Sequence, residues 1–141
     1  MQSERSIRIV LDANTIVSAL FGSDSKPAEV LARVISGKVI NCISNDILKE
    51  VESVLLRPKI VKKTKEHERN YILQLLTSIS VFVAPKQKLD VIKDDDADNR
   101  ILECALEAKI GYIISGDTYL LRLQEYKGVK IVNSNEFLRS I

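Results

Sequence analysis

The sequence predicts an α/β fold in three layers, in which helices cover both faces of a central, mostly parallel sheet. Short runs rich in β-branched residues alternate along the chain with longer stretches of helical periodicity, which is typical of this fold class. No repeat, linker or low-complexity tract interrupts the alternation over the 141 residues. We therefore expect one domain spanning residues 1–141.

Each expected element of the first half has a start or stop signal. Residues 7–11 form an aliphatic run of the kind found in a central strand buried on both faces. A proline in the first turn and a glycine beyond the last predict a helix over residues 27–36. A second strand is expected at 39–43, and a serine or asparagine then caps a helix that stops near Arg57 and Pro58.

The second half continues the same alternation. Apolar residues at helical spacing between positions 71 and 79 precede a β-like alternation at 81–83 and an acid-rich loop. A further helix is expected from Asp98 to a stop at Gly111. The remaining predicted elements are a strand at 112–115, a short helix at 118–123, a turn at Lys127 and Gly128, a strand at 129–132, and a terminal helix with a capping box of Asn133 and Glu136.

Composition excludes several classes of function. No run of 18 apolar residues exists, so a membrane span is not expected. The two cysteines have no paired spacing and residues 1–6 contain no apolar signal, so we expect a cytoplasmic protein with reduced thiols in its core. The single histidine, His67, lies in a lysine-rich segment, which argues against serine or cysteine triads and histidine-ligated zinc. A net charge of +2 indicates no particular partner.

Four acids are expected to converge at one edge of the sheet. Asp12 directly follows the first strand, and Asp117 follows the strand at 112–115 by one glycine. Asp98 lies within the apolar arc of its helix, and Glu50 lies at the edge of another apolar stripe. Each acid alone fits a helix cap or turn. Together, such carboxylates repel unless a cation neutralises them, and oxygen ligands without histidine or cysteine favour Mg²⁺ or Mn²⁺ and phosphoryl chemistry.

With these residues placed, the sequence resembles the PIN-domain family of metal-dependent ribonucleases. The resemblance is carried by IVLDANT at 9–15, NDILKE at 45–50, RPK at 57–59, DDADNRILECA at 95–105 and SGD at 115–117. It implies a five-stranded sheet of order 3-2-1-4-5, with catalytic, metal-ligating acids at Asp12, Glu50, Asp98 and Asp117. The resemblance is greatest to the toxin components of prokaryotic toxin–antitoxin systems, which implies in-line hydrolysis of RNA, a cognate antitoxin and a homodimer.

Two further groups of residues have both functional and structural interpretations. One group lies beside the acids: Asn14, Thr15, Asp96, Glu103 and Ser115. These residues either orient the ligands and a water molecule, or they only cap turns and form a solvated loop. The other is a basic run that either binds RNA phosphates or forms a solvated surface: Arg57, Lys59, Lys62, Lys63 and Lys65.

Two alternative functions stay open at this level. Residues 12–15 are also similar to the first motif of haloacid-dehalogenase phosphatases, but Asn14 replaces the second aspartate of that motif. A catalytically silent RNA-binding or partner-binding module would retain the PIN-like fold without turnover. Metal-dependent cleavage distinguishes the enzyme from the silent module.

Overall fold

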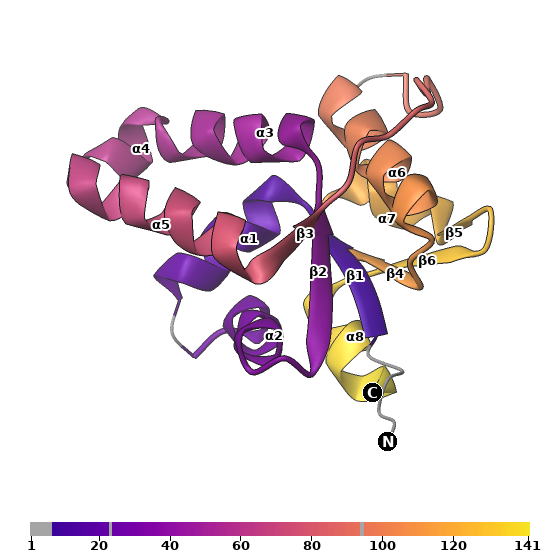
Figure 1. The fold of residues 1–141 in the computed structure, drawn as a ribbon, viewed down its shortest axis with the longest axis horizontal. Helices are drawn as coiled ribbons and strands as arrows, with labels where there is room; N and C mark the ends of the chain where they lie inside the picture. The colour runs from indigo at the N-terminus through magenta and orange to yellow at the C-terminus, as the bar shows by residue number, and fades with distance from the viewer. Residues whose placement is uncertain (1–6, 23, 94) are drawn as a thin grey trace.

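The computed structural model describes residues 7–22, 24–93 and 95–141, in which a six-stranded sheet has helices on both sides (Figure 1). Residues 1–6, where no export signal was predicted, and Asp94 of the acid-rich loop lie outside the described residues. The strands are β1 (Ile7–Leu11), β2 (Val39–Ile43), β3 (Ser80–Phe82), β4 (Tyr112–Ile114), β5 (Glu125–Tyr126) and β6 (Val129–Val132). Their order is β3-β2-β1-β4-β6-β5.

The predicted α/β class and mostly parallel sheet are confirmed, whereas the predicted count of five strands needs correction. Every pairing is parallel except that of β5 with β6. The additional strand, β5, has only two residues and therefore no detectable alternation. It joins β6 through Lys127 and Gly128, whose φ angles of 48° and 88° form the predicted turn. Without β5 the order is the expected 3-2-1-4-5.

Helices lie on both sides of the central strands. They are α1 (Ala13–Phe21), α2 (Lys26–Ile35), α3 (Asn45–Leu55), α4 (Pro58–Val61), α5 (Glu66–Ile79), α6 (Asp96–Ala108), α7 (Thr118–Leu123) and α8 (Ser134–Ser140). In Figure 1, α1, α2 and α5 lie on one side of β1 and β2, and α6 and α7 lie on the other. Within the described ranges, no helix combines the length and apolar character needed to cross a bilayer.

The core is centred on β1, as predicted. Ile9 and Val10 are fully buried between β2 and β4 because helices cover both faces of this strand. The two cysteines, Cys42 and Cys104, are free thiols buried in the core, and His67 is exposed, as expected.

The boundaries of α6 differ from the prediction in a way that affects the site. The helix begins at Asp96, two residues earlier than expected, because Asp95 is the N-cap and accepts a hydrogen bond from the Asp98 backbone N–H at 3.3 Å. It ends at Ala108, where Lys109 and not Gly111 adopts the left-handed conformation, with φ 55°. Asp98 thus lies in the first turn of α6, close to the carboxyl ends of β1 and β4.

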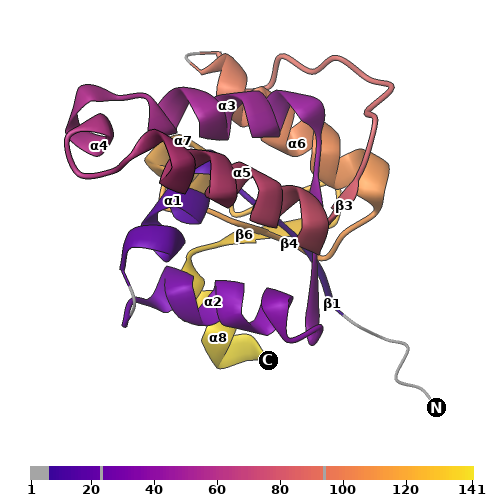
Figure 2. The same ribbon diagram turned by 60° about the vertical axis from the view of Figure 1, so that its left-hand side comes forward.

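A long connection leads from β3 to α6, and its described residues, 83–93 and 95, form no helix or strand. We call residues 84–93 the strap. Figures 1 and 2 show the connection passing from β3 to the start of α6. The strap therefore ends where the acidic residues at the start of α6 begin.

Candidate functional site

A cleft of about 350 Å³ lies between α3 and α6, beyond the carboxyl end of β1. This is the edge of a parallel sheet where binding sites are expected. All four predicted acids line the cleft, together with three more carboxylates. The acids are Asp12, Asp46, Glu50, Asp95, Asp96, Asp98 and Asp117, and the cations that line it are Arg57, Lys88 and Arg100.

Ser115 connects two of the predicted acids. Its hydroxyl donates to Asp12 Oδ2 and accepts from the Asp117 backbone N–H at 2.9 Å. Asp12 Oδ1 also accepts from the Thr15 N–H at 2.9 Å, so both oxygens of this buried carboxylate are fixed. Asp117 Oδ1 accepts from the first amides of α7, including that of Tyr119 at 2.8 Å. Asp12 caps α1 and Asp117 caps α7, and both also line the cleft, so the structural and functional interpretations are compatible.

The tightest cluster contains Asp98, Asp117 and Asp95. One carboxylate oxygen from each lies within 4.8 Å of the other two. Asp98 is 5% exposed, and burial raises its pKa to about 8, with hydrogen bonding to Asp117 and the charges of neighbouring acids acting in the same direction. The remaining predicted ligands, Asp12 and Glu50, line the same cleft but lie outside this group of three.

The residues predicted beside the acids have different positions. Asn14 and Asp96 line the cleft, and Asn14 Oδ1 accepts from Arg57 Nη1 at 3.3 Å. Thr15 and Ser115 line an adjoining hollow of about 590 Å³, which shares Asn14 with the cleft.

Glu103, predicted near the ligands, lies away from the cleft. It is 4% exposed and pairs with Arg100 at 2.8 Å, and its Oε2 accepts from the Leu89 N–H of the strap at 2.7 Å. The physical reason is its position on α6: five residues after Asp98, it lies about 140° around the helix from that residue, so its side chain is directed at the strap.

Four charged residues of the cleft have no predicted role in the sequence: Asp46, Lys88, Asp95 and Arg100. Asp46 and Arg100 lie on α3 and α6, next to predicted acids. Asp95 was grouped with a solvated acidic run, although an aspartate three residues before Asp98 is a recognisable N-cap signal. Lys88 had no local signal, because nothing in an irregular segment indicates which lysine faces an acidic cleft. Asp95 and Lys88 reach the cleft from the connection between β3 and α6.

The basic run divides into one residue at the cleft and four outside it. Arg57 follows α3 and lines the cleft. The four lysines lie in or directly after α4, all exposed, and none of them lines the cleft: Lys59, Lys62, Lys63 and Lys65. Lys63 instead lines a separate hollow with Phe21 and Tyr71.

The donor set fits a hard divalent cation. The acidic cluster offers only carboxylate oxygens, which Mg²⁺ and Mn²⁺ prefer. Asp98 Oδ2 is buried and has no hydrogen-bond partner among the described residues. A buried carboxylate oxygen without a partner is costly unless a ligand satisfies it. Asp95, Asp98 and Asp117 are therefore suited to hold such an ion, with Asp12 and Glu50 in the same cleft.

The fold and the cleft together define an α/β protein with a carboxylate-lined site at the edge of a parallel sheet. The sequence profile of the PIN domain family matches residues 8–119, so the chain belongs to this family, whose members are generally nucleases. Membership decides against the haloacid-dehalogenase alternative.

A curated protein and two solved structures are also similar to this chain. An uncharacterized protein of Methanocaldococcus jannaschii, MJ1680, is 37% identical over 131 residues, which cover 90% of this chain and 82% of the relative. The crystal structure of PAE2754 from Pyrobaculum aerophilum has a TM-score of 0.64 at 14% identity and covers 99% of this chain and 92% of that one. The VapBC2 structure from Rickettsia felis, bound to a promoter DNA fragment, has a TM-score of 0.62 at 13% identity, with coverages of 90% and 98%. At such identities the two structures support the fold.

The raised pKa of Asp98 predicts a pH-dependent effect on stability. An unfolded aspartate ionises near pH 4, whereas folded Asp98 stays protonated to about pH 8, so its contribution to folding is complete below pH 4 and is lost as the pH rises toward 8. Without metal, we expect Asp98→Asn to raise the free energy of unfolding by about 1 kcal/mol at pH 8 and by almost nothing at pH 4. Urea unfolding at both pH values measures the difference.

Added Mn²⁺ is expected to reverse the ranking at pH 8, because only the wild type keeps the carboxylate that binds the ion. An equal effect of the substitution at both pH values, or a wild type that Mn²⁺ does not stabilise, contradicts this interpretation of Asp98.

Proposed function

We propose that this PIN-domain protein is an Mg²⁺- or Mn²⁺-dependent endoribonuclease. The observation that carries the proposal is the cluster of Asp95, Asp98 and Asp117 in a protein of a nuclease family. One buried oxygen of this cluster has no hydrogen-bond partner in the part of the chain that the structure describes. Asp12 and Glu50 belong to the same acidic lining. Asp95, Asp98 and Asp117 would hold the divalent ion, which would offset their charges and supply Lewis-acid activation of water and phosphodiester for in-line hydrolysis.

The protein's own contribution is to hold the carboxylates before substrate arrives. Ser115 fixes Asp12 relative to Asp117, and the amides at the start of α7 hold Asp117 in place. Such positioning removes reorganisation from the reaction step. Arg57, held at the rim by Asn14, supplies a cation for a substrate phosphate.

The direct test uses the purified protein and a short single-stranded RNA. Cleavage is expected with Mg²⁺ or Mn²⁺ and is expected to stop when EDTA is added. Cleavage that survives EDTA contradicts the metal requirement. Stoichiometric RNA binding with no cleavage in either ion supports the silent-module alternative.

The lysines of α4 and the turn after it are proposed to extend phosphate binding beyond the cleft. Replacing Lys59, Lys62 and Lys65 by glutamine is expected to raise KM for RNA and leave kcat nearly unchanged, because these groups lie outside the cleft. The log–log salt slope of KM is expected to flatten by about two units, since each single-strand phosphate contact contributes about 0.7. An unchanged KM and slope would assign the run to a solvated surface.

A toxin role with a protein partner is also proposed. The sequence resembles the toxin components of toxin–antitoxin systems, and the fold is similar to that of VapBC2. This chain also exposes large apolar side chains near one hollow of about 880 Å³. Phe21 and Tyr71, which are 46% and 64% exposed, line that hollow. Such a surface suits an antitoxin or a second copy in a homodimer. Light scattering of the purified chain, with Tyr71→Glu as a comparison, tests self-association.

A further inference from the structure

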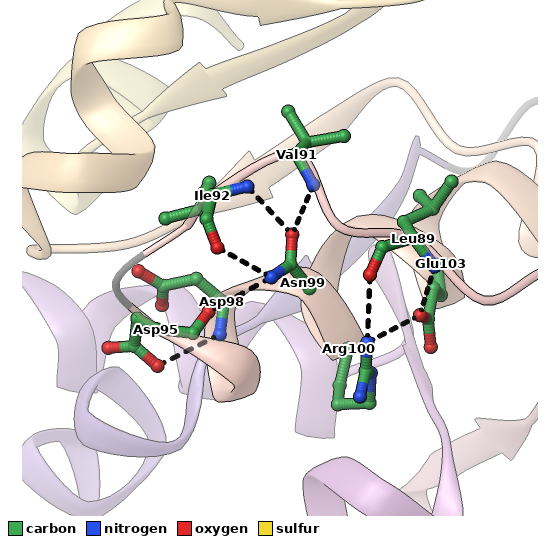
Figure 3. A network of polar contacts seen from close by, with 8 residues as sticks. All are labelled: Leu89, Val91, Ile92, Asp95, Asp98, Asn99, Arg100 and Glu103. Atoms are coloured by element: carbon green, nitrogen blue, oxygen red, sulfur yellow. Dashed lines mark hydrogen bonds and ion pairs between the residues drawn. The ribbon is translucent and has the colours of Figure 1, made fainter.

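Side chains of α6 hold the strap at three positions along the helix, and Figure 3 shows the two nearest to the start of α6. Asn99 Oδ1 accepts from the N–H groups of Val91 and Ile92, each at 2.9 Å, and its Nδ2 donates to the Ile92 carbonyl at 2.7 Å. One turn further along α6, Glu103 accepts from the Leu89 N–H at 2.7 Å and Arg100 donates to the Leu89 carbonyl at 3.0 Å. A third contact joins Glu107 to the Lys86 N–H at 3.1 Å.

The middle contact, in which Glu103 and Arg100 hold Leu89, costs desolvation free energy. Glu103 and Arg100 have side chains that are 4% and 15% exposed, so two charges leave water to form this pair. Arg100 Nε is buried and has no partner among the described residues. Buried ion pairs contribute little net stability, but they fix geometry. The geometry fixed here is that of Leu89, because both of its backbone polar groups are held.

Lys88 precedes this fixed residue and lines the acidic cleft. Its side chain is exposed, and it forms no ion pair within the described ranges. Arg57 reaches the same cleft from the end of α3, whereas Lys88 reaches it from the strap on α6. Arg57 and Lys88, which form no ion pair with a carboxylate of the described residues, thus approach the seven carboxylates of the lining from the two walls of the cleft.

We propose that Lys88 is a substrate-binding residue that contacts an RNA phosphate at the mouth of the cleft, and that the Glu103–Arg100 pair is its positioning device. This inference rests on the proposed ribonuclease function. A phosphate backbone that crosses the acidic cleft meets net negative charge, so cations at both rims lower the electrostatic cost of approach. Lys88 acts as a point charge and carries no base specificity.

The competing interpretation is that Lys88 only offsets the charge of the acids. The two interpretations differ in what the loss of the charge changes. A phosphate contact affects RNA affinity and its salt dependence, whereas a charge offset affects the affinity of the acids for a divalent cation. Binding of RNA and binding of Mn²⁺ therefore separate them.

The experiment measures fluorescence anisotropy of a labelled single-stranded RNA, with Mn²⁺ present and cleavage blocked by Asp12→Asn. In this background, Lys88→Gln is expected to weaken RNA binding about fivefold at low salt and to reduce the log–log salt slope by about 0.7. Lys86→Gln is the matched control, because Lys86 is an exposed lysine two residues away that does not line the cleft. It is expected to leave both quantities unchanged.

The positioning role is tested in the same assay. Glu103→Gln keeps an acceptor for the Leu89 N–H but removes the charge pair, and it is expected to weaken RNA binding about as much as Lys88→Gln does. The double variant is expected to bind RNA with the same affinity as Glu103→Gln alone. Once Lys88 is no longer positioned, removing its charge has little further effect on RNA binding. Circular dichroism shows whether Glu103→Gln folds. If it does not, the comparison of Lys88→Gln with Lys86→Gln decides the proposal.

Each outcome has a distinct meaning. The inference is overturned if Lys88→Gln and Lys86→Gln change RNA affinity equally. It is also overturned if Lys88→Gln binds RNA as the parent does but binds Mn²⁺ more tightly. If wild type cleaves RNA while Lys88→Gln binds RNA normally, only the inference fails. If Lys88→Gln weakens RNA binding but wild type never cleaves, only the ribonuclease function fails. No RNA binding by the parent protein overturns both.

Discussion

Asp12→Asn is expected to lower kcat/KM for RNA cleavage by at least about a thousandfold while leaving the fold intact. The charge that helps to hold a divalent ion is lost, and metal assistance contributes several kcal/mol to such reactions. The fold survives because an asparagine oxygen can still accept from the Thr15 N–H and cap α1. Its amide nitrogen can donate to the Ser115 hydroxyl in place of the bond that Asp12 now accepts.

Steady-state cleavage of one RNA oligonucleotide in Mn²⁺ measures this effect. Asp24→Asn is the matched control, because Asp24 is exposed outside the cleft, and its activity should equal that of wild type. Asp117→Asn should resemble Asp12→Asn. Full activity in Asp12→Asn, with a wild-type melting temperature, would show that the cleft is not the catalytic site.

Asn99→Ala is expected to cost about 3 kcal/mol of unfolding free energy, although Asn99 has no predicted chemical role. Asn99 is fully buried, and its side chain satisfies two amides and one carbonyl of the strap. Alanine leaves these groups without partners, and each buried group left unsatisfied costs about 1–3 kcal/mol, partly relieved by relaxation of the strap. Urea denaturation at constant pH measures the change.

The comparison variant is Asn70→Ala, an exposed position on α5, where the change should stay within about 0.5 kcal/mol. Hydrogen exchange adds a local measurement, because the amides of Val91 and Ile92 should lose protection in Asn99→Ala. If both variants have the same stability, other contacts hold the strap.

The acids of the site could be predicted where a periodic element fixes their direction. Asp98 lies in the apolar arc of a helix, and Asp12 follows an aliphatic strand, so the direction of both side chains follows from local pattern. Asp95 and Lys88 belong to a connection without period. The position of Lys88 depends on hydrogen bonds between the strap and α6 that join residues 7 to 21 positions apart. Asp95 is held locally, by the bond from the Asp98 N–H three positions away.

The basic run illustrates a different limit. Five cations in nine residues are easily found in the sequence, but the orientation of a four-residue helix depends on tertiary packing. Only Arg57 lies at the cleft. Glu103 shows the converse, since its charge suggested chemistry near the ligands whereas its contacts are those of a buried support for the strap. The two-residue strand β5 is too short to leave a pattern.

The hydroxyl of Ser115 that links Asp12 with Asp117 has a consequence for the order in which the molecule is made. Asp12 and Ser115 are separated by 103 positions, and they meet only when β1 and β4 have paired. Parallel pairing over such a separation is slow, because the intervening chain must close a long loop first. During synthesis, the acidic residues of the amino-terminal half therefore emerge from the ribosome long before their partners exist. The cleft acquires its geometry only after most of the chain has been translated, and a truncated product that stops before β4 lacks it.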